Sequence, residues 1–258
     1  MGRMRWRVLP VLILLVLAFA CVAVWYLQPY PVGSAALEAM RGGEGVTVTD
    51  TMEWIVFEGG QTFEPSLILY PGGRVQAESY APLARLLADE GYRVFLAKMP
   101  FNLAVLDVER ANRLFKNFPD DVFVIGGHSL GGAMAAQFAA EYPERIVGVY
   151  LLGAYPDHRG DLSETELPVL SLLGSRDGLV DREKYELGKT YLPEDAVYLS
   201  IEGGNHAQFG SYGEQPGDGK ALIAPQDQWQ QTAAMLEQWL ITLMTDMAGE
   251  PKDEAGQG

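Results

Sequence analysis

The most constraining feature of this sequence is an apolar run that leads directly into a glycine-rich turn. Residues 122–132 read VFVIGGHSLGG. The β-branched and aromatic residues predict a buried strand, and the small residues from Gly131 onward predict a helix packed closely against it. Between them, Gly127 to Gly131 places Ser129 in a tight strand-to-helix turn. Such a turn exposes the serine hydroxyl, as a nucleophile requires.

Strand-like and helix-like segments alternate along most of the chain. The predicted strands are 46–49, 54–57, 66–70, 94–97, 122–125, 147–152, 169–173 and 197–201, and the predicted helices are 35–41, 81–87, 106–115, 131–141 and 226–247. Because most strands are continuous apolar runs between helices, they predict a mostly parallel central sheet with helices on both faces. The fold class is therefore α/β, with an opening hairpin around Asp50.

The composition excludes several classes of protein. The chain has 258 residues, of which 48% are hydrophobic, and it has one cysteine and a net charge of -15. This length and hydrophobicity predict one large globular domain, and the single cysteine excludes a disulfide scaffold. Because the acidic excess is repelled by phosphate backbones, a nucleic-acid partner is excluded as well.

The first thirty residues differ from the rest in charge and hydropathy. Arg3, Arg5 and Arg7 precede an uncharged, mostly apolar run from Val8 to Leu27. At about 1.5 Å per residue, a helix over this run spans roughly 30 Å, the thickness of the hydrocarbon core of a bilayer. Positive charges before it favour a cytoplasmic N-terminus. We therefore expect a single-pass transmembrane helix that anchors an extracytoplasmic domain.

Two other interpretations of this segment remain open. Ala18-Phe19-Ala20 has the small-x-small form of a signal-peptidase site, and cleavage there would give a secreted protein. Cys21 could carry a lipid, although its preceding residues fit that signal poorly. The anchor is preferred because the apolar run continues past the cleavage site. The chain then divides into an anchor or signal segment at 1–30, a linker at 31–45, one domain at 46–247 and a disordered tail at 248–258.

A serine nucleophile needs a base, and the base needs a carboxylate that orients it. Of the three histidines, His206 follows the last predicted strand and is the expected base. His128 lies inside the turn, where its side chain should point elsewhere, and His158 precedes the best acid candidate. That candidate is Asp177, which follows the strand at 169–173. Asp181 and Glu202 are the reserve candidates for the acid.

Acyl transfer also requires hydrogen-bond donors for the developing oxyanion. The backbone N–H of Leu130, at the start of the helix after Ser129, is one candidate. The second is expected in the loop after the predicted strand 66–70, which reads YPGGRV. Gly73 is the preferred donor in this loop, and Arg74 is the alternative.

The chain resembles the α/β-hydrolase superfamily, and more closely its compact bacterial fold-5 type, which is related to dienelactone hydrolases and small esterases. The resemblance covers residues from about 67 to 239 and rests on YPGGRV, GGHSLGGAMA, GSRDGLV and GGNHAQFG followed by QPGDG. It implies a serine hydrolase with the triad Ser129, Asp177 and His206, without a cofactor or metal. Dienelactone hydrolases use a cysteine nucleophile, whereas this chain has Ser129.

The expected activity is hydrolysis of an ester, thioester or amide of a small acyl substrate, most simply as a carboxylesterase. A peptidase or acyltransferase on the same triad, and a non-catalytic binding protein of this fold, are the alternatives; the oligomeric state is left open. The short polar connection at 153–168 predicts little or no lid, and the long loop 207–223 is expected to fold over the site. Asp218 in that loop predicts a turn rather than a cation site.

Overall fold

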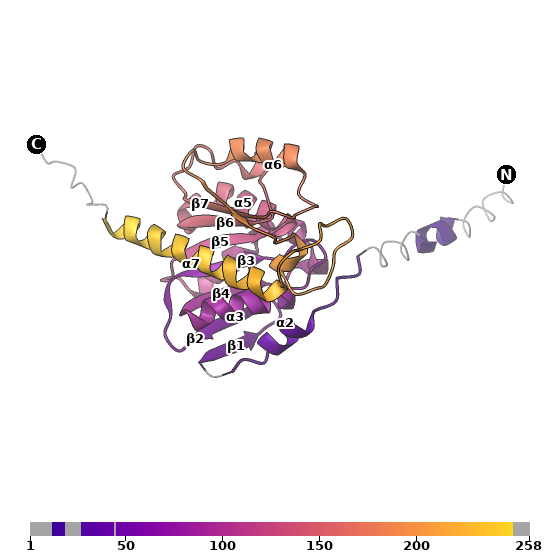
Figure 1. Ribbon diagram of the computed structural model, residues 1–258, viewed down its shortest axis with the longest axis horizontal. Helices are drawn as coiled ribbons and strands as arrows, with labels where there is room; N and C mark the ends of the chain where they lie inside the picture. Colours follow the sequence, from indigo (N-terminus) through magenta and orange to yellow (C-terminus); the bar gives the residue numbers. More distant parts are fainter. Residues whose placement is uncertain (1–11, 19–26, 44, 250–258) are drawn as a thin grey trace, which may run out of the picture.

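The computed structural model describes residues 12–18, 27–43 and 45–249. In these residues one sheet has the strand order β1-β2-β4-β3-β5-β6-β7-β8 (Figure 1). The strands are β1 (Val46–Asp50), β2 (Trp54–Gly59), β3 (Phe63–Tyr70), β4 (Tyr92–Ala97), β5 (Phe123–His128), β6 (Gly148–Leu152), β7 (Val169–Gly174) and β8 (Val197–Ile201). β1–β2 and β2–β4 are antiparallel pairs, and every pair from β4 to β8 is parallel. The predicted α/β class, its mostly parallel sheet and the opening hairpin are confirmed.

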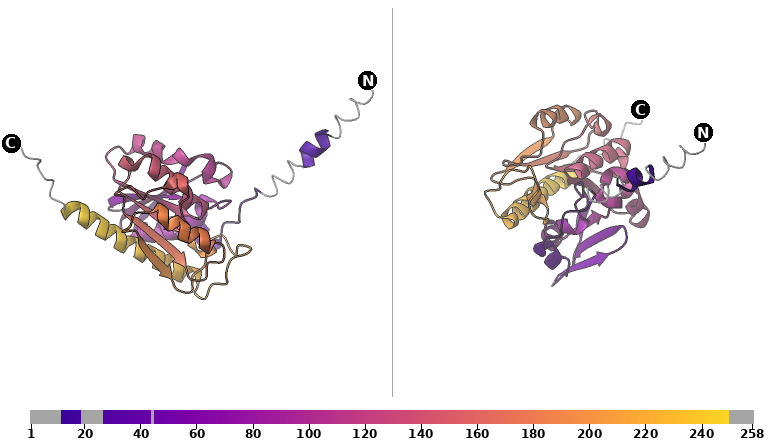
Figure 2. Two further views of the ribbon diagram at one scale, coloured as in Figure 1. Left: turned by 90° about the horizontal axis from the view of Figure 1, so that it is seen from above. Right: turned by 90° about the vertical axis from the view of Figure 1, so that its right-hand side faces the viewer.

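Helices cover both faces of this sheet (Figure 2). They are α2 (Ser34–Ala39), α3 (Ala81–Asp89), α4 (Asn112–Asn117), α5 (Leu130–Glu141), α6 (Arg182–Gly188) and α7 (Pro225–Gly249). Because side chains alternate along a strand, Leu67 and Leu69 of β3 pack in the core beneath α3 and α7, whereas Ile68 and Tyr70 pack in the core beneath α5. The central strand is thus buried on both faces, which explains its continuous apolar sequence.

The predicted helix over 106–115 is wrong in most of its length. Its residues form two 3-10 turns, Ala104–Leu106 and Val108–Ala111, and the α-helix begins only at Asn112. The buried Tyr70 hydroxyl explains this, since it donates to Val108 O at 2.7 Å and accepts from the Ala111 N–H at 2.9 Å. A side chain from β3 therefore binds backbone groups that the helix would need for itself. Helix α6, whose N-terminus is capped by Asp181, was not predicted.

The predicted transmembrane helix lies mostly outside the described residues. Of the run 8–27, the structure describes 12–18, which are helical, and Leu27. Among the described residues, no helix is both long enough and apolar enough to span a bilayer. The predicted linker 31–45 contains α2, whose Ala36 is fully buried in the core beneath α3. Residues 250–258 of the predicted tail lie outside the described part of the chain, and α7 continues through Gly249.

The carboxyl ends of the parallel strands lie at one edge of the sheet, where the loops after β3, β5, β6, β7 and β8 meet. Figure 1 shows α7 beginning at this edge and running to the opposite one, while residues 27–33 leave the domain at the loop edge. The connection between β6 and β7 contains only one 3-10 turn, His158–Gly160. The loop edge is therefore where chemistry on this fold is expected.

Candidate active site

Ser129 lies at the junction of β5 and α5 in a strained backbone conformation. Its φ of 54° and ψ of -123° are unusual for a residue with a side chain. The Ser129 N–H donates to Leu152 O of the neighbouring strand β6 at 3.0 Å, and the Ser129 carbonyl accepts from the Ala133 N–H at 3.2 Å. The turn is thus held by the sheet on one side and by the first turn of α5 on the other.

Two glycines allow this turn to form. A Cβ atom at Gly127 would lie 2.5 Å from Tyr70 O and 2.6 Å from Gly131 C, and one at Gly131 would collide with the backbone of Tyr70 and Pro71. Real Cβ atoms do not approach backbone atoms so closely. The Gly-x-Ser-x-Gly pattern is therefore a consequence of how tightly α5 packs against β3.

Asp177 and His206 form a buried hydrogen-bonded pair. His206 Nδ1 lies 2.8 Å from Asp177 Oδ2, and the two residues are only 3% and 6% exposed. The second carboxylate oxygen accepts from the N–H groups of Leu179 and Val180, each at 2.9 Å. Burial by itself raises the pKa of the Asp177 carboxyl, but the hydrogen bonds from His206, Val180 and Leu179 outweigh it and lower that pKa below its ordinary value. The carboxylate is therefore ionised, and Nδ1 of His206 carries the proton that binds it.

The residue that precedes Ser129 brings the turn into contact with this pair. The rings of His128 and His206 have centroids 4.5 Å apart, and the His128 ring is 5.6 Å from Phe209. The three sequence-predicted triad residues are thus contributed by loops at one edge of the sheet. His158 and Glu202 are exposed, and Asp181 caps α6, so the structure does not bring these three candidates into the pair.

His128 also connects the nucleophile turn to the loop after β3. Its Nδ1 lies 2.8 Å from the Tyr80 hydroxyl, which accepts from the Gly72 N–H at 2.9 Å. Burial raises the pKa of the Tyr80 phenol, and burial together with the nearby His206 lowers the pKa of His128. The phenol therefore donates its proton to a neutral imidazole. His128 is a packing and positioning residue here, in agreement with its exclusion as the base.

The loop after β3 offers three consecutive N–H groups near Leu130. Gly72 donates to Tyr80, and Arg74 donates to Asn102 O at 2.8 Å. The Gly73 N–H lies between these two engaged groups. A Cβ atom at Gly73 would lie 3.3 Å from Leu130 Cδ2, so the two candidate donor residues are neighbours. The Arg74 N–H is thus already bound, whereas Gly73 lies beside Leu130, the other candidate donor.

Comparison with known proteins identifies the family. A family model described as the alpha/beta hydrolase family matches residues 66–230, which is more than half of the chain. The chain belongs to the alpha/beta hydrolase family. This confirms the resemblance inferred from the sequence motifs. No significant match was found among curated proteins.

Solved structures of several hydrolases share the fold. A membrane phospholipase A, described as a bacterial virulence factor, has a TM-score of 0.59 at 18% identity, over 91% of this chain and 98% of that one. Naproxen esterase (carboxylesterase NP) from Bacillus subtilis has a TM-score of 0.57 at 13% identity, over 79% and 94%. Dienelactone hydrolase from Anabaena variabilis has a TM-score of 0.50 at 18% identity, over 76% and 96%. At these identities the likeness concerns the fold.

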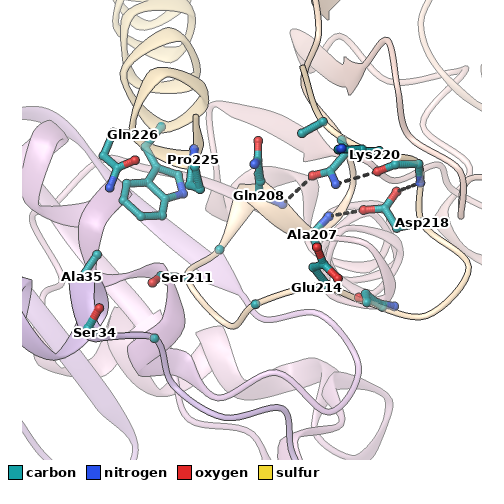
Figure 3. Close-up of a pocket in the computed structure, with 18 residues that line it drawn as sticks. Ser34, Ala35, Ala207, Gln208, Ser211, Glu214, Asp218, Lys220, Pro225 and Gln226 are labelled. Atoms are coloured by element: carbon teal, nitrogen blue, oxygen red, sulfur yellow. Dashed lines mark hydrogen bonds between the residues drawn. The ribbon is translucent and has the colours of Figure 1, made fainter. Parts of the chain in front are cut away.

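Asp218 is a residue of this alpha/beta hydrolase whose importance the sequence did not reveal. Its Oδ1 accepts from the N–H groups of Gly178 at 3.0 Å and His206 at 3.3 Å. Its Oδ2 accepts from the Ala207 N–H at 2.8 Å, a bond that Figure 3 shows. Gly178 directly follows Asp177. One carboxylate thus ties the loop of the acid to the loop of the base. Within the described residues no group of three His, Cys, Asp or Glu residues could hold a metal.

The loop that carries His206 is also fixed to helix α7. Gln228 is fully buried; its Oε1 accepts from the Asn205 N–H at 3.0 Å, and its Nε2 donates to the Asn205 carbonyl at 2.8 Å. Behind this loop lies a cleft of about 710 Å³ between α2, the loop and the start of α7 (Figure 3). Asn205 and Ala207, the chain neighbours of His206, line this cleft, whereas the three candidate triad residues do not.

Gly153 is a second residue that sequence reasoning missed. It follows β6 with a φ of 52°, and a Cβ atom there would lie 3.1 Å from both Asp177 Oδ2 and His206 Nδ1. A side chain at this position would press on the hydrogen bond itself. The sequence signal was weak, because Gly153 is one of 29 glycines and its neighbours form no motif.

Proposed function

We propose that this alpha/beta hydrolase is a serine hydrolase that cleaves carboxylic esters through an acyl-enzyme. The observation that carries the proposal is the buried 2.8 Å contact between Asp177 and His206, which lie against the turn that holds Ser129. In this arrangement the Nδ1–H group of His206 donates a hydrogen bond to the Asp177 carboxylate. The imidazole is thereby held in one orientation, and Nε2 is left to act as a base. The fold likeness to a carboxylesterase and a phospholipase A agrees with ester substrates.

The proposed reaction proceeds in two halves. Ser129 Oγ attacks the carbonyl carbon while its proton passes to His206 Nε2, and the N–H groups of Leu130 and Gly73 bind the oxyanion. Collapse of this intermediate breaks the ester bond, and His206 returns the proton to the leaving alkoxide. His206 then takes a proton from water, which attacks the acyl carbon, and it returns that proton to Ser129 Oγ as the acid is released. No cofactor enters these steps.

Covalent labelling tests the proposal. A fluorophosphonate probe should label the wild-type chain and fail to label Ser129→Ala, and the same substitution should abolish hydrolysis of p-nitrophenyl esters. Ser163→Ala, on the exposed connection after β6, is the matched serine control and should retain both activities. Equal labelling of Ser129→Ala and wild type would contradict the proposal.

The substrate class distinguishes the alternatives. Turnover of amides or thioesters but not esters would favour a peptidase or acyltransferase that uses the same triad. No turnover, together with thermal stabilisation by a ligand, would favour a binding protein.

We also propose that the N-terminal segment anchors the catalytic domain outside the cytoplasm. The support is the sequence itself, with three arginines before an uncharged run of membrane-spanning length. The name of one structural relative, a membrane phospholipase A, agrees with this location.

A further inference from the structure

Residues 28–33 lie against the loop that carries Gly73. We call these residues the strap. The Arg74 guanidinium donates to Gln28 O from Nε at 3.1 Å and from Nη2 at 3.0 Å, and the Tyr30 N–H donates to Arg74 O at 2.9 Å. The guanidinium also lies over the Tyr30 ring, 5.1 Å from its centroid. Gln28 and Tyr30 thus hold both the backbone and the side chain of Arg74, the residue after Gly73.

The strap also contacts the loop that follows His206. The rings of Tyr30 and Tyr212 have centroids 5.4 Å apart, and the Gly33 N–H donates to Ser211 O at 2.7 Å. Tyr212 is almost completely buried. The strap therefore contacts both the loop that carries Gly73 and the loop that follows His206. These contacts lie along the edge of the sheet where residues 27–33 leave the domain (Figure 1).

The backbone of Arg74 needs this support. Its φ of 64° is in the left-handed region, which a residue with a side chain rarely adopts. Asn102 O accepts the Arg74 N–H on one side, and the Tyr30 N–H binds the Arg74 carbonyl on the other. Gly72 is bound by Tyr80, so the residues on both sides of Gly73 are held by hydrogen bonds. Strain of this kind persists only where surrounding contacts hold it.

We infer that the strap is a positioning element of the oxyanion hole, with Tyr30 as its central positioning residue. This inference rests on the proposed function. The strap acts by keeping Arg74 in its left-handed conformation, which aims the Gly73 N–H at the position of the oxyanion. It follows the apolar run 8–27 directly in the sequence, so the segment proposed as the anchor leads into the strap, which contacts the loop that carries Gly73.

The test compares Tyr30→Ala with Tyr30→Phe in the full-length chain. Tyr30→Ala removes the ring beneath the guanidinium and should lower kcat about 10-fold, less than the 10²- to 10³-fold typical for loss of a whole oxyanion donor. KM and the midpoint of the pH profile of kcat/KM should stay unchanged, because the triad is untouched. Tyr30→Phe keeps the ring and should recover the wild-type kcat. Binding of a boronic acid that forms a tetrahedral adduct should weaken in parallel with kcat.

Two further variants keep the test decisive. Arg74→Ala removes both hydrogen bonds to Gln28 and should reproduce the loss even if Tyr30→Ala does not fold. Arg41→Ala removes only an exposed ion pair with Glu38 and should keep the wild-type kcat. Wild-type kcat in both Tyr30→Ala and Arg74→Ala would overturn the inference, as would a loss accompanied by a shifted pH profile. If the wild-type chain itself shows no labelling and no turnover, the proposed function fails instead.

Discussion

The acid–base half and the oxyanion half of this site are stabilised in different ways. Asp177 and His206 are almost fully buried; Asp218 joins their two loops, and Gln228 fixes the loop of His206 to α7. Gly73 and Arg74 are partly exposed, and the strap holds them through backbone contacts, a guanidinium and an aromatic ring. Removing a buried acceptor leaves donors without a partner, whereas water can replace a contact at the surface. We therefore expect larger losses from damage to the acid–base half.

The largest expected effect comes from replacing the buried acid. Asp177→Asn should lower kcat by about 10⁴-fold, the loss measured when the same change is made in a serine protease triad, because an amide no longer holds the imidazole in the reactive tautomer. Asp181→Asn is the matched control, since this exposed residue only caps α6. Steady-state kinetics on one ester would measure both variants. A larger loss in Asp181→Asn would reassign the acid and break the comparison.

A smaller loss is expected at the residue that joins the two buried loops. Asp218→Asn should lower kcat by about 10- to 100-fold, because an amide cannot accept all the N–H groups that the carboxylate binds. An unpaired buried N–H also costs about 1–3 kcal/mol, so the melting temperature should fall as well. Asp195→Asn, on the exposed loop before β8, should change neither quantity. If Asp218→Asn lost less kcat than Tyr30→Ala, the acid–base half would not be the more sensitive one.

The smallest expected effect concerns stability against acid. Folding lowers the pKa of Asp177 below its ordinary value of 3.8, so its ionised carboxylate stabilises the folded state above the unfolded-state pKa. This contribution is lost as the pH falls through the lower, folded-state pKa. Denaturant unfolding between pH 6 and pH 2 should therefore show a steeper loss of unfolding free energy in wild type than in Asp177→Asn. Parallel pH profiles would mean that the hydrogen bonds do not favour the ionised form.

The sequence predicted the parts of the site that local patterns encode. The sequence predicts Ser129 as the nucleophile because a buried strand, a glycine turn and a small-residue helix follow one another without interruption. Asp177 and His206 are predicted as acid and base because each follows the end of an apolar strand, and parallel strands in one sheet bring their carboxyl ends to the same edge. These signals depend on neighbours in the chain, so they could be read directly.

The supporting residues could not be predicted in this way. Asp218 contacts Gly178 across 40 residues of sequence, and Arg74 contacts Gln28 across 46. The helix expected over 106–115 failed for the same reason, since the Tyr70 hydroxyl that binds Val108 and Ala111 comes from a distant strand. Hydrogen bonds between distant segments leave no periodic pattern in either segment.

The sequence by itself determined the fold class, and it predicted an order of nucleophile, acid and base and two alternatives for the second oxyanion donor. Only the tertiary structure shows the Arg74 N–H bound to Asn102 and the Gly72 N–H bound to Tyr80, and this is the reason for proposing Gly73 as the donor. It also revealed that a side chain at Gly153 would press on the Asp177–His206 hydrogen bond and that the strap contacts Arg74 in the loop that carries Gly73. Strand, turn and helix preferences act over a few residues, whereas the direction of a single N–H group depends on every segment packed around it.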